Sequence, residues 1–238
     1  MKQLALDFVS TPPPTLDNFV PGCNGEVVEN ITRLVAGSRE RSIYVWGSAG
    51  CGRSHLLEGA VASMRRAGHG AIYHACGRGS AVPDLERCDL VALDDVDRLD
   101  PEGQLSVFHL FNTLRECGGG LLASGAAPPV QLQLREDLAT RLGWGLVFQV
   151  HPLSDEDKAR ALFERAAALG FGLPPAVCDL LLTRGRRDMR SLLALVDALD
   201  RYSLETKRPV TAPLARELLG AAEARAAGPV SGDGGSAA

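Results

Sequence analysis

The sequence has few aromatic residues and no cysteine pattern of the kind that binds metal. Aromatic residues make up 5% of the 238 residues and hydrophobic residues 45%, so we expect a core built mainly from Leu, Val and Ala. The six cysteines include no C-x-x-C pair and no other metal-ligand spacing. Most of them lie among apolar residues, which predicts reduced thiols in a core, as is typical of a cytosolic protein.

Long hydrophobic runs and an excess of positive charge are missing as well. No apolar stretch is long enough to cross a membrane, and the N-terminus lacks the hydrophobic region of a signal peptide, so we expect a cytoplasmic protein with no membrane partner. The net charge of −4 gives little electrostatic attraction to nucleic acid. The length is sufficient for one larger domain and a small one.

The strongest positive signal is a phosphate-binding loop at Gly47–Ser54. Its spacing is that of G-x-x-x-x-G-K-[ST], except that Arg53 stands where Lys is expected. The β-rich stretch 42–46 predicts a buried strand before the loop, and 54–64 predicts a helix after it, which is the context that this motif requires. The glycines let backbone N–H groups point inward, the helix N-terminus adds partial positive charge, and the Ser54 hydroxyl is placed to hold Mg²⁺. An ordinary glycine-rich turn is the alternative.

Arg53 is the departure from this motif. Lysine is a compact charge at the β- and γ-phosphates, whereas arginine is larger, planar and forked. Most of the seat consists of backbone N–H groups, so nucleotide binding is expected to survive, while the placement of the γ-phosphate should suffer. We therefore predict weak intrinsic hydrolysis. The sequence leaves open whether ADP or ATP is the active ligand.

Strands that alternate with helices predict an α/β fold with a parallel five-stranded sheet covered on both faces. The predicted strands are Ser42–Trp46, Ala71–Ala75, Leu90–Asp95, Leu121–Ser124 and Leu146–Val150. The predicted helices of this part are Glu26–Ala36, Ser54–Met64, Glu102–Cys117 and Leu134–Leu142.

After Pro152 the strand signals stop and a small all-helical domain is expected. Its helices are predicted at about 155–169, 174–182, 188–206 and 211–219. The expected organisation is therefore a peptide and Pro-rich linker at 1–14, an α/β domain at 15–152, a helical domain at 153–220 and a tail at 221–238. The tail is rich in Ala, Gly and Ser, and we expect disorder from Gly228 onward.

Polar residues end two of the predicted strands. Asp94 is placed to hold Mg²⁺ through water, and Asp95 to polarise an attacking water; a solvated acidic turn is the alternative. Ser124 is a candidate for orienting water near the γ-phosphate, and a plain strand-end serine is nearly as good an interpretation.

Two arginines outside the loop are further candidates. Arg141 precedes a Gly-Trp-Gly turn, where it could be presented to a neighbouring subunit as an arginine finger. Arg190 lies in the helical part, from which it could reach the phosphates and report the nucleotide state. On the residues alone, ordinary solvated arginines explain both positions as well or better.

The N-terminal peptide Gln3–Phe8 is apolar and is followed by the stiff stretch Pro12–Pro14. A peptide held ahead of a proline spacer does not fold back easily into a core, which makes it a candidate docking peptide. A frayed N-terminal strand is an equally good interpretation.

Several of these stretches resemble one family. Thr15–Val20, the loop through Leu57, the strand ending in Asp94-Asp95, Arg141–Gly145 and Asp188–Arg190 resemble, in this order, the AAA+ core of the DnaA replication initiators. The Gly-Arg-Ser of the loop and Pro152–Lys158 look like the Hda-type regulatory inactivators of that family. The resemblance implies an AAA+ sheet followed by a helical lid, and the N-terminal peptide resembles those that bind the β sliding clamp.

The resemblance implies a role for each matching nucleotide-site residue. Phe19 and Val20 would lie near the adenine of ADP or ATP, Ser124 near the γ-phosphate, and Arg190 would sense the nucleotide. The phosphates would be held by Gly47, Gly50, Cys51, Gly52, Arg53 and Ser54, with Mg²⁺ on Ser54 and Asp94.

The resemblance also implies partners. Gln3, Leu4, Leu6 and Phe8 would fill the peptide pocket of the β sliding clamp of DNA polymerase III, so DNA would be met only through the clamp. Arg141 would act in trans on ATP held by DnaA, which makes the chain a negative regulator of replication initiation that activates hydrolysis by its partner. A homo-oligomer is compatible with the sequence.

Two departures from the family pattern bear on this function. Ala126-Ala127 stands where the family often carries Asp-Arg, which puts a polar contact there in doubt. The missing loop lysine weakens any claim to intrinsic ATPase activity. Two alternatives stay open: a helicase-loader-like or DNA-remodelling ATPase, and a non-enzymatic adaptor between the clamp and DnaA.

Overall fold

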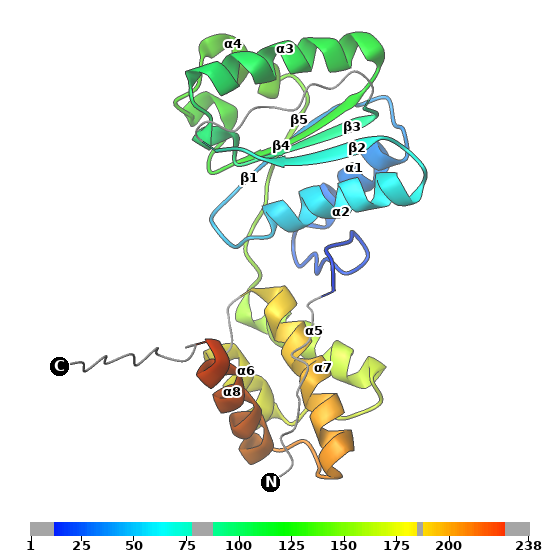
Figure 1. Cartoon of the computed structure of the whole chain (residues 1–238), viewed down its shortest axis with the longest axis vertical. Coiled ribbons are helices and arrows are strands. Elements are labelled where there is room, and N and C mark those ends of the chain that lie inside the picture. Colours follow the sequence, from blue (N-terminus) through cyan, green and yellow to red (C-terminus); the bar gives the residue numbers. More distant parts are fainter. Residues whose placement is uncertain (1–11, 78–87, 185–187, 227–238) are drawn as a thin grey trace, which may run out of the picture. The chain divides into compact units, whose positions relative to one another are not determined.

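The computed structural model describes residues 12–77, 88–184 and 188–226 (Figure 1). The chain divides into two compact units, one over residues 13–154 and one that contains the helices from residue 155 onward. The first unit carries the sheet and the second is helical throughout its described part.

Five parallel strands form the sheet of the first unit, in the order β2-β3-β4-β1-β5. The strands are β1 (Ser42–Trp46), β2 (Ala71–Ala75), β3 (Leu90–Asp94), β4 (Gly120–Gly125) and β5 (Leu146–Gln149). The predicted α/β class with a parallel five-stranded sheet is confirmed.

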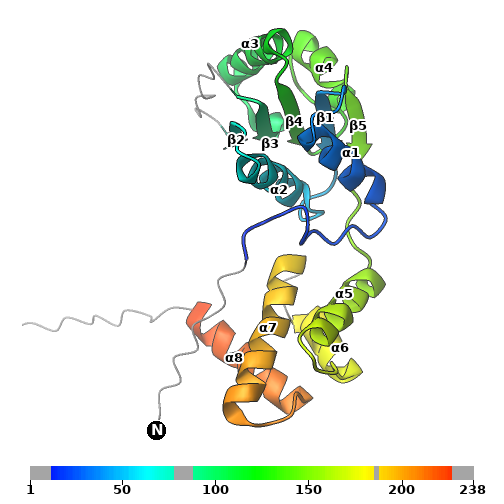
Figure 2. The same ribbon diagram turned by 90° about the vertical axis from the view of Figure 1, so that its right-hand side faces the viewer.

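Helices cover the sheet on both faces, as Figures 1 and 2 show. Helices α1 (Gly25–Val35) and α2 (Arg53–Arg66) pack on one face, and α3 (Pro101–Cys117) and α4 (Glu136–Leu142) on the other. Alternate residues of β1 serve the two cores, with Ile43 and Val45 on the α2 side and Tyr44 on the α3 side. Every residue of β3 and β4 is buried, as expected of central strands.

The register brings the functional strand ends to one edge of the sheet. Val45 pairs with Ser124, and Leu93 pairs with Ala123. The loop after β1, the end of β4 and the end of β3 therefore meet at the carboxyl edge, where ligands of open α/β sheets bind.

Local chemistry explains most helix boundaries. At the start of α3 the Asp100 side chain accepts a hydrogen bond from the Gly103 N–H, and Pro101 occupies the first turn, where its missing N–H costs nothing. The same helix ends at Gly118, whose φ of 73° lies in the left-handed region.

The predicted elements differ from the structure mainly at their ends. Strand β3 stops at Asp94, one residue before its predicted end, because Asp95 leaves the extended conformation with φ 54°. Helix α4 begins at Glu136 rather than Leu134, and a short 3-10 turn, η2 (Pro129–Gln131), precedes it. Another 3-10 turn, η1 (Val96–Arg98), follows β3.

The second unit consists, in its described part, of four helices around a separate core. They are α5 (Asp155–Ala168), α6 (Pro175–Arg184), α7 (Met189–Thr206) and α8 (Ala212–Ala226). Helix α8 continues past its predicted end at Leu219 because the following residues are mostly alanine, the best helix former. None of the helices in the described part of the chain has the length and apolarity that a membrane crossing requires.

Candidate functional site

The loop between β1 and α2 has the backbone that a phosphate seat requires. Gly50 and Gly52 have φ values of 79° and 108°, in the left-handed region that other residues rarely adopt. A Cβ on Gly47 would lie 2.3 Å from the Val150 carbonyl oxygen. Gly52 precedes α2 without a side-chain cap. The amides of the first turn are therefore available to an anion.

The segment before α1, residues 15–19, packs against this loop and the first turn of α2. The Phe19 ring packs edge-on to His55 with centroids 5.3 Å apart, and it covers Gly52 so closely that a Cβ there would lie 2.8 Å from the ring. The His55 Nε2 contacts the Thr15 carbonyl oxygen at 3.0 Å and the Asn18 Oδ1 at 2.8 Å. Phe19 thus lies beside the loop, and its place near the adenine stays a prediction.

Val20, which follows Phe19, is half-buried, and its predicted contact with the adenine stays a prediction. His55 was not singled out in the sequence. Its position directly after Ser54 was the available signal, since the first turn of that helix faces the loop.

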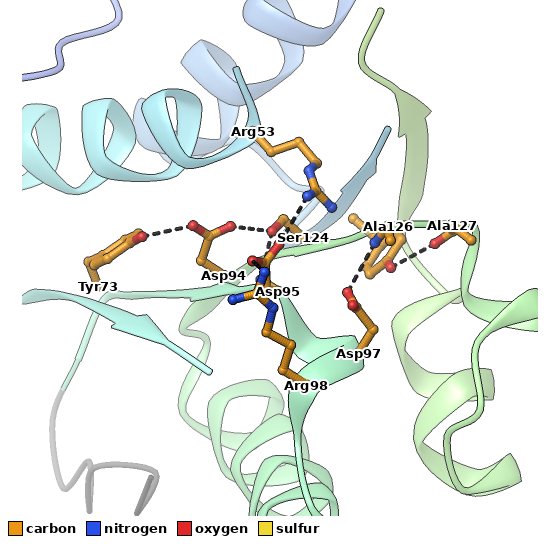
Figure 3. A network of polar contacts seen from close by, with 10 residues as sticks. Arg53, Tyr73, Asp94, Asp95, Asp97, Arg98, Ser124, Ala126 and Ala127 are labelled. Carbon is orange, nitrogen blue, oxygen red and sulfur yellow. Dashed lines mark hydrogen bonds and ion pairs between the residues drawn. The ribbon is translucent and has the colours of Figure 1, made fainter. Parts of the chain in front are cut away.

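Arg53, in the place of the motif lysine, points toward the end of β3. Its Nη2 lies 3.0 Å from Asp95 Oδ1, and only 11% of its side chain is exposed. The second amino group, Nη1, is buried and has no hydrogen-bond partner among the described residues. One amino group of the Arg53 guanidinium thus pairs with a carboxylate, and the other has no hydrogen-bond partner among the described residues (Figure 3).

Asp95 is held by two cations and by its backbone. Its Oδ2 lies 3.4 Å from Arg98 Nη2, in addition to the pair with Arg53. Its left-handed φ of 54° is uncommon for a residue other than glycine. Its N–H donates to Ser124 Oγ at 2.9 Å. Both oxygens are therefore engaged with guanidinium groups, and the predicted water-polarising role of Asp95 stays a prediction.

Asp94 is buried and accepts two hydroxyl hydrogen bonds. The Tyr73 hydroxyl donates to Oδ2 at 2.8 Å, and the Ser124 hydroxyl donates to Oδ1 in a short hydrogen bond. Burial raises the pKa of Tyr73, and Asp94 raises it further, while a hydrogen bond with Ser54 lowers it. Tyr73 thus connects the two residues that we expect to hold Mg²⁺. Sequence analysis missed it because nothing near it in the chain marks the contact.

The segment after β4 is fixed without the Asp-Arg of the family pattern. The Ala126 N–H donates to Asp97 Oδ1 at 3.0 Å, and the Tyr44 hydroxyl donates to the Ala127 carbonyl oxygen at 2.9 Å. Burial is the main cause that raises the pKa of Tyr44, so its hydroxyl stays a donor. A Cβ on Gly125 would lie 2.0 Å from that hydroxyl, which leaves room only for glycine.

Arg141 lies in the last turn of α4 and stacks on an exposed ring. Its Cζ is 3.8 Å from the centroid of Trp144 and 5.6 Å from that of Phe108. Arg115 lies over the same indole at 5.1 Å. The ion pairs found between described residues include neither Arg115 nor Arg141.

The other predicted residues lie outside this unit. Arg190 is the second residue of α7, half-buried, with an Nε that has no hydrogen-bond partner among the described residues. Its role as a nucleotide sensor stays a prediction. Gln3, Leu4, Leu6 and Phe8 lie outside the described residues.

Comparison with known proteins agrees with this geometry. Residues 155–219 match the family model described as "Hda, lid domain". DnaA from Aquifex aeolicus, solved with bound AMPPCP, is 22% identical, with a TM-score of 0.64 over 82% of this chain and 67% of that one. Domain III of Thermotoga maritima DnaA is 21% identical, with a TM-score of 0.66 over 88% and 97%. A T. maritima RuvB mutant is 13% identical, with a TM-score of 0.60 over 88% and 73%.

The parallel sheet in the order 2-3-4-1-5, followed by a helical lid, is the AAA+ fold. Identities this low show the fold alone, and the family match concerns residues 155–219. Residues 155–219 match the lid domain of Hda, and the chain shares its fold with domain III of DnaA, as the motifs predicted.

Proposed function

We propose that this chain is a negative regulator of replication initiation that holds an adenine nucleotide, docks on the β sliding clamp and stimulates hydrolysis of ATP bound to DnaA. Arg141 acts in trans as an arginine finger. The observation that carries the proposal is that Arg141 stacks on an exposed indole and belongs to none of the ion pairs found between described residues. A cation in that state remains free to meet another protein's phosphates.

The loop supports the nucleotide part of the proposal. Its backbone is that of an anion seat, and the DnaA protein from A. aeolicus that shares this fold holds AMPPCP. Arg53 and Asp95 neutralise one another next to the loop, which favours holding a nucleotide over hydrolysing it. Comparison of the affinities for mant-ADP and mant-ATP decides which nucleotide the loop holds.

The donor set at the strand ends fits Mg²⁺. Ser54 and Asp94 provide the hard oxygen ligands that Mg²⁺ prefers, and phosphate oxygens and water complete such sites. No group of three or more His, Cys, Asp or Glu side chains suited to a metal occurs among the described residues. When bound, Mg²⁺ would neutralise phosphate charge.

The catalytic contribution of Arg141 is electrostatic. Phosphoryl transfer develops charge on the phosphate oxygens, and a guanidinium in place at that moment accelerates the reaction by about 10³–10⁵-fold. The partner supplies the nucleotide, the metal and the water. This chain supplies one positive charge.

A single assay tests the finger. ATP pre-bound to DnaA is followed in the presence of clamp loaded on DNA, with wild type, Arg141→Ala or the control Arg33→Ala added. Arg33 is an exposed arginine of α1 that pairs with Glu29. We expect Arg141→Ala to reduce the stimulated rate by about 10³-fold and Arg33→Ala to leave it unchanged, with mant-ADP affinity equal in all three.

The two alternatives give different results in the same assay. A non-enzymatic adaptor keeps its activity in Arg141→Ala. A helicase-loader-like or DNA-remodelling ATPase hydrolyses ATP by itself and binds DNA without the clamp.

The docking peptide is tested separately. Deletion of residues 3–8 should abolish clamp binding in a pull-down and leave the thermal unfolding midpoint unchanged. A lowered midpoint together with retained clamp binding would identify these residues as a structural strand instead.

A further inference from the structure

The Trp144 side chain is anchored on one side and open on the other. It is 52% exposed, which is unusual for the largest apolar side chain. Its ring nevertheless packs edge-on to Phe111, with centroids 6.2 Å apart and planes at 78°. Phe111 belongs to the buried core between α3 and the sheet. The indole is thus a fixed aromatic surface that faces solvent.

The backbone that carries Trp144 is equally constrained. The Gly143 N–H donates to the Ala139 carbonyl oxygen at 3.1 Å, and the Trp144 N–H to that of Arg141 at 3.2 Å, so the turn closes over the end of α4. A Cβ on Gly145 would lie 2.0 Å from the Ser42 carbonyl oxygen. The turn is therefore packed closely against the start of β1.

Arg141 lies on this surface although a carboxylate is available at helical spacing. Asp137 is four residues earlier on α4, the position at which an ion pair is expected. Asp137 instead pairs with Arg135 through two hydrogen bonds, of 3.1 and 2.8 Å, and this pair lowers the pKa of Asp137. The arrangement leaves the charge of Arg141 uncompensated by its nearest candidate acid.

We propose that Trp144 is the positioning residue of Arg141: it holds the guanidinium in one orientation without neutralising it. A carboxylate would fix an arginine equally well but would cancel its charge. An indole face attracts a cation more weakly than a buried carboxylate does, strongly enough to restrict the side chain and weakly enough to release it to a phosphate. This inference rests on the proposed function, which gives the oriented cation its target.

The physical gain is one of preorganisation. A free arginine side chain loses much rotamer entropy when it is fixed in one orientation. Stacking on Trp144, with Phe108 nearby, removes part of that freedom before the partner arrives. A displaced catalytic group can cost about 10²-fold in rate. Removal of the Trp144 ring should therefore lower the rate at which DnaA-bound ATP is hydrolysed.

The kinetic test compares Trp144→Leu with Trp144→Phe in the clamp-dependent assay of DnaA-bound ATP. We expect Trp144→Leu to lower the maximal rate by about 10–100-fold with little change in the half-saturating concentration, and Trp144→Phe to restore most of the rate. Arg115→Ala, which removes the other cation from the same ring, should stay within twofold of wild type. In an Arg141→Lys background, which lacks the planar group, Trp144→Leu should cost nothing further.

A spectroscopic test needs no partner. The ring current of Trp144 should shift the Arg141 Nε–Hε resonance upfield in the wild-type protein, and Trp144→Leu should return it to the position of an ordinary arginine. Trp144 is half exposed, so we expect the variant to fold, and its thermal unfolding midpoint checks this. Should it not fold, Trp144→Phe and the Arg141 resonance of the wild type decide the question.

The outcomes separate the inference from the function on which it rests. A Trp144→Leu protein with a wild-type rate, or an Arg141 resonance at its ordinary position in the wild type, overturns the positioning role while a defective Arg141→Ala keeps the proposed function. An active Arg141→Ala overturns both. Equal losses in Arg115→Ala and Trp144→Leu would also overturn the inference, because they would indicate a general requirement for positive charge.

Discussion

Arg53 and Arg141 lie in the same unit and have opposite surroundings. The side chain of Arg53 is 11% exposed and pairs with Asp95 at 3.0 Å. Arg141 lies on a half-exposed indole at 3.8 Å, and no ion pair between described residues includes it. The charge of one guanidinium is balanced by a carboxylate, whereas the other lies on an aromatic ring, and no ion pair between described residues balances its charge.

The difference teaches what a protein can do with the same group. Next to the phosphate loop, the pair with Asp95 lets a large cation replace lysine without leaving it unpaired when no nucleotide is bound. At the end of α4, the ring of Trp144 restricts the orientation of Arg141 without adding a negative charge. The proposed division follows from these surroundings: one arginine serves this chain's own nucleotide and the other serves a partner's.

The largest effect that could break this comparison is expected at the turn after α4. Gly145→Ala places a methyl group about where the Ser42 carbonyl oxygen lies, since the added Cβ would be 2.0 Å from it. The turn must move, and Trp144 and Arg141 move with it. We expect a loss of about 10²-fold in stimulated hydrolysis on DnaA, measured as phosphate release, with unchanged mant-ADP affinity.

Gly143→Ala is the matched control for that variant. An added Cβ there would lie 3.5 Å from its nearest neighbour, the Ala139 carbonyl oxygen, which is ordinary contact distance. Its activity should stay close to wild type. Equal activity of the two variants would show that the position of the turn has no bearing on the partner's reaction.

A smaller effect is expected from Asp95→Asn, which removes the charge that compensates Arg53. We expect the empty protein to lose about 1–3 kcal/mol of unfolding free energy in urea, because a mostly buried guanidinium loses its counter-ion. With saturating ADP the loss should shrink, since phosphate replaces the carboxylate as the partner of Arg53. Stimulated hydrolysis on DnaA should not change.

Glu29→Gln is the control for this charge effect. It neutralises one partner of an exposed pair, Arg33–Glu29, whose side chains are 63% and 60% exposed. Such pairs contribute little, so the change should stay below about 1 kcal/mol, with or without ADP. The interpretation of Arg53 would be contradicted by an Asp95→Asn loss that ADP leaves undiminished.

The smallest effect concerns the reactivity of buried and exposed cysteines in the first unit. Burial raises the pKa of Cys51, in the phosphate loop, although Arg53 acts in the opposite direction. Burial also raises the pKa of Cys76 to about 12, whereas Cys23 and Cys117 are exposed. A raised thiol pKa means less thiolate at a given pH, so iodoacetamide at pH 8 should label the exposed pair first.

The measurement is peptide mass spectrometry of the labelled protein at pH 8 and pH 9.5. The exposed Cys23 and Cys117 should be labelled at both pH values, while Cys76 stays unmodified. Rapid labelling of Cys51 at pH 8 would contradict the burial of the loop thiol and, with it, the closed surroundings of Arg53.

Much of the fold could be predicted from the sequence because it depends on local patterns. Apolar runs predicted the position of every strand, and the predicted helices 54–64 and 102–117 begin within one residue of α2 and α3. The left-handed conformation of Asp95 could not be predicted, because aspartate also fits the end of a strand. What decides it is the hydrogen bond from its N–H to Ser124, 29 residues away in sequence.

The candidate site was predictable in its residues and not in its contacts. Arg53, Asp94, Asp95 and Arg141 stood out by motif and spacing. The contacts between them depend on tertiary structure. Helical spacing favours a pair between Asp137 and Arg141, yet Arg135 takes the carboxylate, and Tyr73 reaches Asp94 from a neighbouring strand.

The left-handed backbone of Asp95 has a genetic consequence. Only a short list of amino acids tolerates φ 54° without strain, chiefly glycine, asparagine and aspartate. From an aspartate codon, one nucleotide change reaches asparagine and another reaches glycine. Most substitutions of Asp95 that the fold tolerates therefore remove its negative charge. Any ATP hydrolysis by this chain that depends on Asp95 would be easily lost over generations.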